Sequence, residues 1–383
     1  MKVGVTSWFC NVAEWTERIQ TGAFEKPYPI TDTQQLEREL YLADLVEPLG
    51  FDSFWTIEHH FSPYGMTANP AQLLTYMAGR TQRIELGTMV LVLPWHDPLK
   101  LAESLSLLDN LLGGRRLNIG MGRGFAAREF NSMNIPYETS RQRLLEVLDV
   151  VRTALTQEYF SFDGEFFQIP RTAIRPRPRT ADLTRQMLMT WASPESLAMA
   201  ANAGMAPLFT NLSGLDALRD GTQAFNEIRG EHGWSPQPAT VAITVFCHED
   251  QDYASEYATQ YWKAMTGQTI WHYDHLGRAD WLPEISAEER AALIDQAYQS
   301  QTAAGIFGTP EFVIEKIREV QAAGNISHLI TLHSFGDMPR DDVEGSMRMF
   351  AQDVLPVIKQ IPAEQAEAIP FAEWRLSASA ALA

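Results

Sequence analysis

Residues 85–122 read ELGTMVLVLPWHDPLKLAESLSLLDNLLGGRRLNIGMG, and their pattern is the clearest indication of the fold class. Glu85–Leu93 is a short apolar run that predicts a buried strand, and Pro94 closes it. Leu99–Leu112 has the period of a helix, and Arg116–Gly122 is a second apolar run. A strand, a helix and a further strand in this order are typical of a βαβ unit with parallel strands.

The same alternation continues along the whole chain. It predicts eight βα units, with strands at Val3–Trp8, Asp52–Ile57, Glu85–Leu93, Arg116–Gly122, Met187–Trp191, Leu208–Leu212, Thr240–His248 and Ser327–His333. No linker rich in Gly, Pro or Ser separates them, so the simplest closure is an α/β fold of the (β/α)8 TIM-barrel type with insertions. A doubly wound open sheet is the alternative, although the first strand lacks the GxGxxG of its dinucleotide-binding form. We expect residues 1–360 to form one domain and residues 361–383 a C-terminal extension.

Two segments interrupt the alternation. After the fourth unit, EYFSF and EFFQI flank Asp163-Gly164, which predicts a β-hairpin. Behind the seventh strand and its helix, Thr266–Glu289 has no clean period and contains histidine, tyrosine and tryptophan. Because long loops inside compact domains are usually functional, we expect a lid over the active end of the barrel. A packed surface excursion is the plainer alternative.

The charge of the chain excludes several kinds of partner. Lys and Arg total 30 against 48 Asp and Glu, which gives a net charge of −18. Nucleic acid and anionic membranes are themselves polyanions and are poor partners for such a protein. The two cysteines, Cys10 and Cys247, cannot build a disulfide framework. With no signal peptide or membrane span evident, we expect a cytoplasmic protein.

The predicted second strand runs directly into Glu58-His59-His60, which makes both histidines candidate catalytic residues. Histidine has the side-chain pKa nearest to neutrality, and active sites of barrels lie at the carboxyl ends of the strands. A metal pair or two structural histidines are the alternatives. No metal-binding spacing accompanies them, so no metal site is predicted.

Two further strand ends suggest an anion site. Arg123 lies between glycines in GMGRGF, where the backbone can approach a ligand and the guanidinium can bind an anion; a surface arginine in a tight turn is the alternative. Ser193 precedes Pro194 as the predicted N-cap of a helix, and helix N-termini attract anions. Capping alone would also explain Ser193.

Taken in order, five segments and the last helix resemble the bacterial luciferase-like family of flavin-dependent oxidoreductases. The segments are GFDSFWTIEHHF (Gly50–Phe61), RIELGTMVLVLPWHDP (Arg83–Pro98), LLDNLLGGRRLNIGMGRG (Leu107–Gly124), MTWASPESLAMAANAG (Met189–Gly204) and GTPEFVIEKI (Gly308–Ile317), followed by DVEGSMRMFAQDVLP (Asp342–Pro356). The similarity is greatest to the luciferase subunit that carries the active site.

The resemblance implies a two-component monooxygenase. Reduced FMN (FMNH2), supplied by a separate flavin reductase, would react with O2 to a C4a-(hydro)peroxide, and one oxygen atom would enter a small hydrophobic substrate. A homodimer is expected through the helices after the first strands. The same resemblance leaves two alternatives open, namely an F420-dependent hydride-transfer enzyme and a non-catalytic flavin-binding subunit.

The resemblance also assigns roles to single residues. His59 corresponds to the catalytic histidine, thought to act as a base, and His60 is its neighbour. Cofactor-binding positions correspond to Arg123, Ser193 and Ser196 at the flavin phosphate and to Met89-Val90, a cis peptide under the flavin ring. The family's phosphate-site glutamate is replaced by Ala192, whose backbone alone could bind there.

Other positions depart from the family or complete the predicted pocket. A reactive cysteine of some luciferases corresponds to Gly122, and a tryptophan of their substrate pocket to Asn211, so long-chain aldehyde luminescence is not expected. Trp8, Trp55, Trp95 and the aromatic side chains of the lid segment Thr266–Glu289 are candidates for lining a pocket that excludes water.

Overall fold

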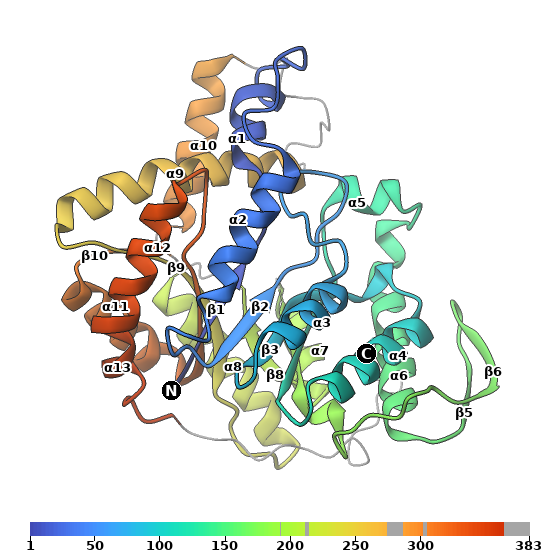
Figure 1. Ribbon diagram of the computed structural model, residues 1–383. Coiled ribbons are helices and arrows are strands. Elements are labelled where there is room, and N and C mark those ends of the chain that lie inside the picture. The colour runs from blue at the N-terminus through green and yellow to red at the C-terminus, as the bar shows by residue number, and fades with distance from the viewer. Residues whose placement is uncertain (192, 211–213, 274–285, 302–304, 364–383) are drawn as a thin grey trace.

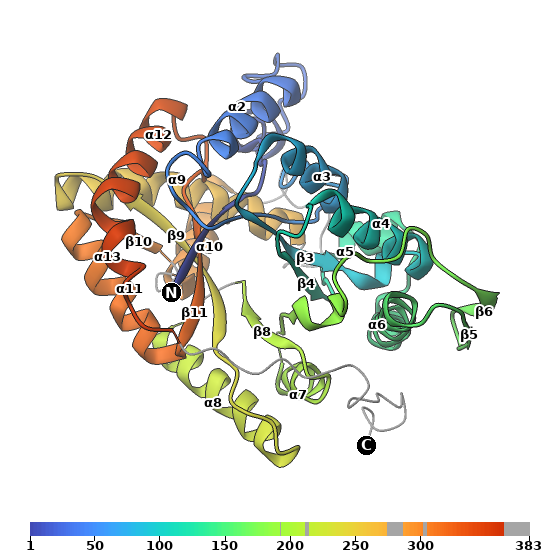
Figure 2. The same cartoon turned by 60° about the horizontal axis from the view of Figure 1, so that its bottom comes forward.

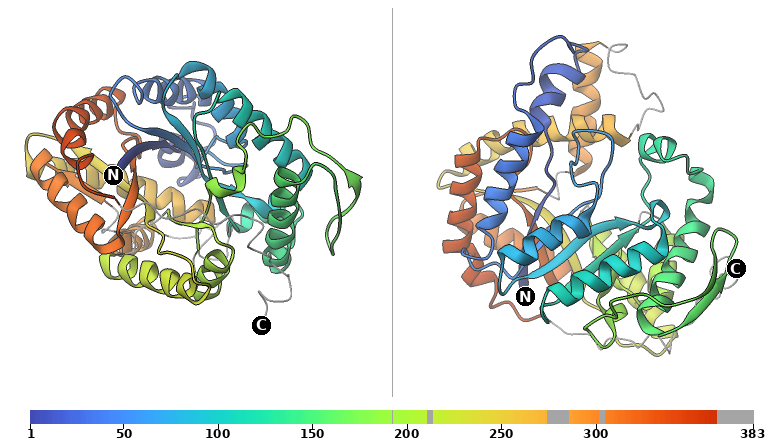
Figure 3. Two further views of the ribbon diagram at one scale, coloured as in Figure 1. Left: turned by 90° about the horizontal axis from the view of Figure 1, so that it is seen from below. Right: turned by 45° about the vertical axis from the view of Figure 1, so that its right-hand side comes forward.

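The computed structural model describes residues 1–191, 193–210, 214–273, 286–301 and 305–363, and its eight inner strands close into a parallel barrel. The strands are β1 (Lys2–Ser7), β2 (Ser53–Thr56), β3 (Glu85–Val92), β4 (Leu117–Gly122), β7 (Met187–Met189), β8 (Ala206–Phe209), β9 (Ala239–Cys247) and β11 (Ile326–Leu332). Pairing of β9 with β8 closes the ring, so the predicted (β/α)8 barrel is confirmed and the open sheet is wrong. Figure 3 shows the strands inside a ring of helices.

The helices of that ring follow the strands in chain order. They are α2 (Asp32–Asp44), α3 (Pro70–Arg80), α4 (Pro98–Leu111), α6 (Ser140–Thr156), α7 (Pro194–Asn202), α8 (Leu215–Glu231), α11 (Pro310–Gly324) and α12 (Arg340–Met349). A π-helical turn (Phe350–Val354) and α13 (Leu355–Ile358) extend α12. Several of these helices begin with a capping side chain followed by proline, as at Asn69-Pro70 and Asp97-Pro98, which fixes where each leaves its loop.

A further strand, β10 (Gly305–Gly308), was not predicted. It pairs with the second half of β9 outside the closed ring, whereas β8 pairs with the first half. GIFG is short and begins and ends with glycine, so it carries little of the strand pattern. A Cβ at Gly305 would lie 1.7 Å from the ring of Trp262, which explains why glycine is needed there.

The segment Thr266–Glu289 is not an irregular loop throughout. Helix α9 (Gln251–Tyr273) runs eight residues beyond the expected end at Met265, and α10 (Ala287–Gln301) begins within the segment. The helix continues because Ile270 and Trp271 pack into a second apolar cluster with Val12 and Trp15. Residues 274–285 lie outside the described part, so the lid itself stays a prediction.

This second cluster lies over the carboxyl ends of the strands. Figure 1 shows α9 and α10 beside α1 (Val12–Glu14) at the end of the barrel opposite the start of β1. The short helix α1 and the π-helical turn Trp15–Ile19 that follows it both contact α9. One wall of the barrel mouth is therefore built from the N-terminal segment and the insertion after β9.

The predicted hairpin is present, with a longer turn than expected. Strands β5 (Phe160–Asp163) and β6 (Gln168–Thr172) are joined by residues 164–167 rather than by Asp163-Gly164 alone. The Glu146 carboxylate accepts the backbone N–H groups of residues 165, 166 and 167, which draws them out of the ladder. The hairpin projects beside α6 at the edge of the molecule (Figure 2).

Trp55 does not line the mouth of the barrel. It is fully buried in the barrel interior, where its indole N–H donates to Ser53 Oγ at 2.7 Å. Ser53 Oγ in turn lies 2.8 Å from His328 Nε2. The missing side chains of Gly4 and Gly87 leave the space that this indole fills. Of the three predicted pocket tryptophans, this one is therefore a core residue.

Buried histidines should make the fold sensitive to acid. Burial lowers the pKa of His328 and of His333 to about 3, below the ordinary value of 6.5. Between these values the unfolded chain binds more protons than the folded protein, so stability falls as the pH is lowered from 6.5. We expect urea unfolding of a His328→Gln variant to show about 2 kcal/mol less difference between pH 7 and pH 5 than the wild type. An unchanged difference would mean that His328 is protonated in the folded state.

Candidate active site

The two adjacent histidines after β2 point to different partners. His59 Nδ1 lies 3.1 Å from Glu129 Oε1, whereas His60 Nε2 lies 3.2 Å from Glu58 Oε1. Only the backbone N–H of His60 reaches Glu129, at 2.6 Å. The segment therefore contributes one imidazole to each of two hydrogen-bond networks.

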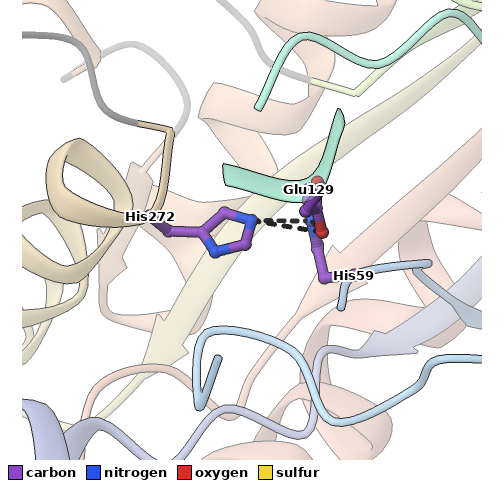
Figure 4. A group of neighbouring side chains, drawn as sticks. All are labelled: His59, Glu129 and His272. Atoms are coloured by element: carbon purple, nitrogen blue, oxygen red, sulfur yellow. Dashed lines mark hydrogen bonds and ion pairs between the residues drawn. The ribbon is translucent and has the colours of Figure 1, made fainter. Parts of the chain in front are cut away.

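The first network joins three elements that lie far apart in the sequence. Glu129 comes from α5 (Ala127–Ser132), and His272 comes from the end of α9. His272 Nε2 lies 3.4 Å from Glu129 Oε1 and 3.1 Å from His59 Nδ1. Figure 4 shows the three side chains converging. The side chains of Glu129 and His272 are 1% and 0% exposed, so this cluster is shielded from solvent.

The charge state of the cluster follows from its contacts. Burial raises the pKa of Glu129, but hydrogen bonds from His272 and His59 outweigh it and lower the pKa to about 2. Burial lowers the pKa of His272 to about 4. Near neutral pH, Glu129 is therefore a carboxylate and His272 is neutral.

Hydrogen bonding then assigns the protons on the rings. The Ser62 hydroxyl lies 2.7 Å from His272 Nδ1 and can donate to it, which places the proton of His272 on Nε2, facing Glu129. The same carboxylate oxygen accepts Nδ1–H of His59 at 3.1 Å, so the 3.1 Å contact between His59 Nδ1 and His272 Nε2 brings together two donors that share this acceptor. His59 Nε2 is then a hydrogen-bond acceptor, the form that a general base requires.

Aromatic side chains surround the acceptor nitrogen. The Tyr273 hydroxyl lies 3.2 Å from His59 Nε2, and the Tyr273 ring stacks on Phe125 with centroids 4.4 Å apart. The Tyr64 hydroxyl bonds that of Tyr273, and the Tyr64 ring stacks on His272 at 4.5 Å. Trp8 packs edge-on against Tyr64. His59 thus lies in an aromatic enclosure at the carboxyl ends of the strands.

The second network fixes the position of the loop. Glu58 is buried and accepts bonds from Val92 N at 2.7 Å and His96 Nε2 at 3.0 Å as well as from His60. Burial raises its pKa, but His96 and His60 lower it overall. The loop after β2 is thereby tied to the end of β3, and the His60 ring packs edge-on against Trp95.

His59, Glu129 and His272 also have the spacing of metal ligands. Their ligand atoms lie within 4.8 Å of one another. Ser62 and Tyr273 bond the remaining nitrogens of the two rings, whereas Glu129 Oε2 is buried and has no hydrogen-bond partner among the described residues. The absence of a metal stays a prediction.

The Met89–Val90 peptide bond is cis, as predicted. It lies where the pairing of β3 with β4 shifts its register, between Thr88 and Leu91. Gly120 and Gly122 of β4 face it, since a Cβ would lie 2.1 Å from Thr88 O in the first case and 2.8 Å from Val90 Cγ2 in the second. The two glycines are therefore required by this bulge.

Arg123 follows directly at the end of β4. Its guanidinium donates to the Tyr137 hydroxyl at 2.7 Å and lies over the Tyr137 ring. Within the part of the chain that the structure describes, no carboxylate forms an ion pair with Arg123. A half-buried guanidinium without an anionic partner is suited to binding an anionic ligand.

Ser193 and Ser196 lie at the N-terminus of α7. They form a capping box, in which Ser193 Oγ accepts Ser196 N–H and Ser196 Oγ accepts Ser193 N–H at 3.0 Å. Hydrogen bonds from the Ser193 side chain and its own backbone lower the pKa of Glu195. This end of α7 therefore already stabilises a negative group. Ala192 lies outside the described residues, as does Asn211.

The predicted cofactor-binding residues lie in or just after three neighbouring strands at one side of the barrel, but their side chains do not all contact one another. β4 and β7 are neighbours, and the missing Cβ of Gly122 faces Thr190 at the end of β7. Arg123 and the start of α7 thus leave adjacent strands. Met89-Val90 lies within β3, the strand on the other side of β4.

Sequence reasoning missed Glu129, the role of His272 and the partner role of Glu58. Glu129 follows Arg123 by six residues and gave no motif of its own. Tyr273 is one of the lid-segment aromatics expected to line the pocket, and it lies there against His59 and Phe125. His272 belongs to the same segment, whose histidines were the available signal for it. Glu58 stood beside the histidines but was not assigned a role.

Comparisons with known proteins agree with this fold. The Luciferase-like monooxygenase family profile matches residues 6–325. The 4-hydroxyprotoasukamycin monooxygenase of Streptomyces nodosus subsp. asukaensis is 29% identical, over 89% of this chain and 92% of that protein. The alkanal monooxygenase alpha chain of Photobacterium leiognathi is 28% identical, over 85% and 94%.

Solved structures have the same architecture. Monooxygenase RslO1 from Streptomyces bottropensis matches with a TM-score of 0.71 and 25% identity, covering 94% of this chain and 100% of that one. The oxygenating constituent of 3,6-diketocamphane monooxygenase from Pseudomonas putida, solved with FMN, gives 0.69 at 20% identity, over 95% and 99%. An F420-dependent secondary alcohol dehydrogenase gives 0.68 at 16%, over 93% and 98%. From the family match over most of its length, the chain belongs to the luciferase-like monooxygenase family, and with it to the flavin-dependent monooxygenases that the sequence predicted.

Proposed function

We propose that the protein is a two-component monooxygenase that uses FMNH2, O2 and a small hydrophobic substrate. The observation that carries this proposal is His59, held by Glu129 as a hydrogen-bond acceptor inside an aromatic enclosure at the barrel mouth. Bound FMNH2 would supply the electrons and the reaction with O2. The protein would supply the binding site, the exclusion of water and a proton acceptor.

The phosphate of FMN would bind between Arg123 and the N-terminus of α7. Arg123 lacks an anionic partner among the described residues. The N-terminus of α7 already stabilises the carboxylate of Glu195, whose pKa is lowered by hydrogen bonds there. A phosphate would bind there by displacing that carboxylate, with Ser193, Ser196 and the backbone of Ala192 as further ligands. This local positive end opposes the net charge of −18.

The ring of FMN would lie against Met89-Val90. Val90 and Trp8 both pack on the apolar cluster of the barrel interior that includes Met89. The indole N–H of Trp8 is buried and has no acceptor in the described part of the protein. A flavin offers carbonyl and nitrogen acceptors at its edge, so an unpartnered donor beside an apolar surface fits such a ring.

His59 would take a proton from the substrate during the reaction. The Glu129 carboxylate faces His59 Nδ1–H and would stabilise the imidazolium that forms, while His272 holds Glu129 in place. His60 would contribute through its backbone N–H and through its tie to Glu58.

A separate flavin reductase would provide FMNH2, by free diffusion or by transient contact. We place the enzyme in the cytoplasm, since Cys10 and Cys247 are both free. No helix among the described residues is long and apolar enough to cross a membrane.

A homodimer through the helices after the first strands is part of the proposal. Tyr76 of α3 and Leu107 and Leu111 of α4 are 49%, 47% and 51% exposed on neighbouring helices. We expect Leu107→Glu/Leu111→Glu to convert a dimer to a monomer in light scattering, because charges cannot be buried unpaired in an interface. A substitution on another face, Tyr253→Glu, should leave the mass unchanged. A wild-type monomer would contradict this part of the proposal.

Anaerobic titration tests the cofactor. We expect FMNH2 to bind and F420H2 to bind at least tenfold more weakly, and we expect NADH consumption through a generic flavin reductase to yield oxygenated product once a substrate is supplied. Tight binding of F420H2 without binding of FMNH2 would instead support hydride transfer.

A further inference from the structure

Tyr273 holds a phenol in contact with the proposed base. Its hydroxyl lies 3.2 Å from His59 Nε2, and its ring stacks on Phe125 with centroids 4.4 Å apart and planes at 17°. The side chain therefore makes the two contacts that a hydroxyaromatic ligand would make in this enclosure. One is a hydrogen bond at its oxygen, and the other is stacking on its face.

Tyr273 and His272 are held by different contacts. The Tyr273 hydroxyl contacts His59 and its ring stacks on Phe125, whereas His272 is anchored by Ser62 and Glu129. The Phe125 side chain is 47% exposed. Rotation of the Tyr273 side chain would uncover both His59 Nε2 and Phe125 without moving His272.

We propose that the substrate is a hydroxyaromatic compound whose phenolic ring takes the place of Tyr273 against His59 and Phe125. This deepens the proposed function and rests on it for the role of His59. The chemical class of the substrate follows from whether the site offers a hydrogen-bond donor or an acceptor. Because Glu129 accepts Nδ1–H of His59, Nε2 offers a lone pair and selects a ligand that donates an O–H. A carbonyl group offers only lone pairs and would leave Nε2 without a donor.

The same contact prepares the substrate for oxygenation. The phenolic O–H bond breaks, its proton forms the N–H bond at His59 Nε2, and its electron pair stays on the oxygen. The product is a phenolate beside an imidazolium that faces the Glu129 carboxylate. A phenolate ring is richer in electrons than the phenol, and an electron-rich ring is what an electrophilic oxygen donor requires.

Binding of two matched probes tests this inference without flavin. We expect 2-naphthol to bind at least fivefold more tightly than 2-methoxynaphthalene in fluorescence titrations, because only the naphthol can donate to His59. In His59→Ala this ratio should fall to about one. In Phe125→Ala both probes should weaken by a similar factor, because stacking serves both.

The Tyr273→Ala variant shows whether the ligand takes the place of the Tyr273 side chain or only binds beside it. Removing the internal phenol should tighten 2-naphthol at least threefold, whereas a ring that binds elsewhere would be unaffected. Tyr253→Ala, an exposed tyrosine at the opposite end of α9, serves as the control and should change neither probe, and thermal unfolding verifies that each variant is folded. Equal affinities of the two probes, absence of binding, or a ratio that survives in His59→Ala would overturn the inference. The FMNH2 titration is independent of all of these, so a failure here is distinguishable from a failure of the proposed function.

Discussion

His59→Ala is expected to lower product formation by 10²-fold or more while the dissociation constant for FMNH2 changes less than threefold. A positioned general base contributes about 10²–10⁴-fold to a rate. His59 lies among Glu129, His272 and Tyr273, and Arg123 and α7 are proposed to hold the phosphate separately. Single-turnover formation of product with pre-bound FMNH2 measures the first quantity, and anaerobic titration measures the second.

Two variants make this result specific. Glu129→Gln keeps the shape of the side chain but removes the charge that would stabilise the imidazolium, so we expect an intermediate loss of about tenfold. His232→Ala removes a histidine at the end of α8, bonded to Asn202 and remote from the strand ends, and should leave the rate unchanged. Normal product formation by His59→Ala would remove His59 from the mechanism. Absence of product from the wild type with bound FMNH2, across hydroxyaromatic and aliphatic substrates, would instead favour a non-catalytic flavin-binding subunit.

The barrel was predictable because each βα unit carries its own signal. Glu85–Val92 and Leu117–Gly122 are apolar along their length, as strands buried on both faces are, and Asp97-Pro98 marks the start of the helix between them. The cis peptide at Met89–Val90 followed from resemblance and not from physical reasoning. In the structure, Gly120 and Gly122 are the residues that make room for it.

The site was only partly predictable, because its contacts are set by tertiary structure. His59 and His272 are 213 residues apart, and no local pattern indicates that they meet. The expected end of α9 at Met265 failed for the same reason, since the burial of Ile270 and Trp271 against the N-terminal segment sustains the helix. The prediction for Trp55 was wrong because a strand residue can point into the barrel core as well as toward its mouth. Here the hydrogen bond to Ser53, which also contacts His328, holds the Trp55 indole in the core.

Arg123→Ala is expected to raise the dissociation constant for FMNH2 at least tenfold and to leave the thermal unfolding temperature nearly unchanged. A hydrogen bond to a charged group contributes about 1.5–3 kcal/mol, which corresponds to a factor of roughly 10 to 150 in affinity. The guanidinium bonds the Tyr137 hydroxyl and has no carboxylate partner in the described part of the chain, so its loss costs the fold little.

Comparison with riboflavin shows whether the lost affinity belongs to the phosphate. Reduced riboflavin lacks the phosphate, so its affinity should be weak in the wild type and should not weaken further in Arg123→Ala. Arg123→Lys should retain part of the affinity, because an ammonium keeps the charge but loses the planar pair of donors. Arg348→Ala, which removes an exposed arginine paired with Glu344 on α12, is the matched control. Equal weakening of FMNH2 and reduced riboflavin in Arg123→Ala would place this residue at the flavin ring, and an unaltered FMNH2 constant would move the phosphate to another part of the barrel mouth.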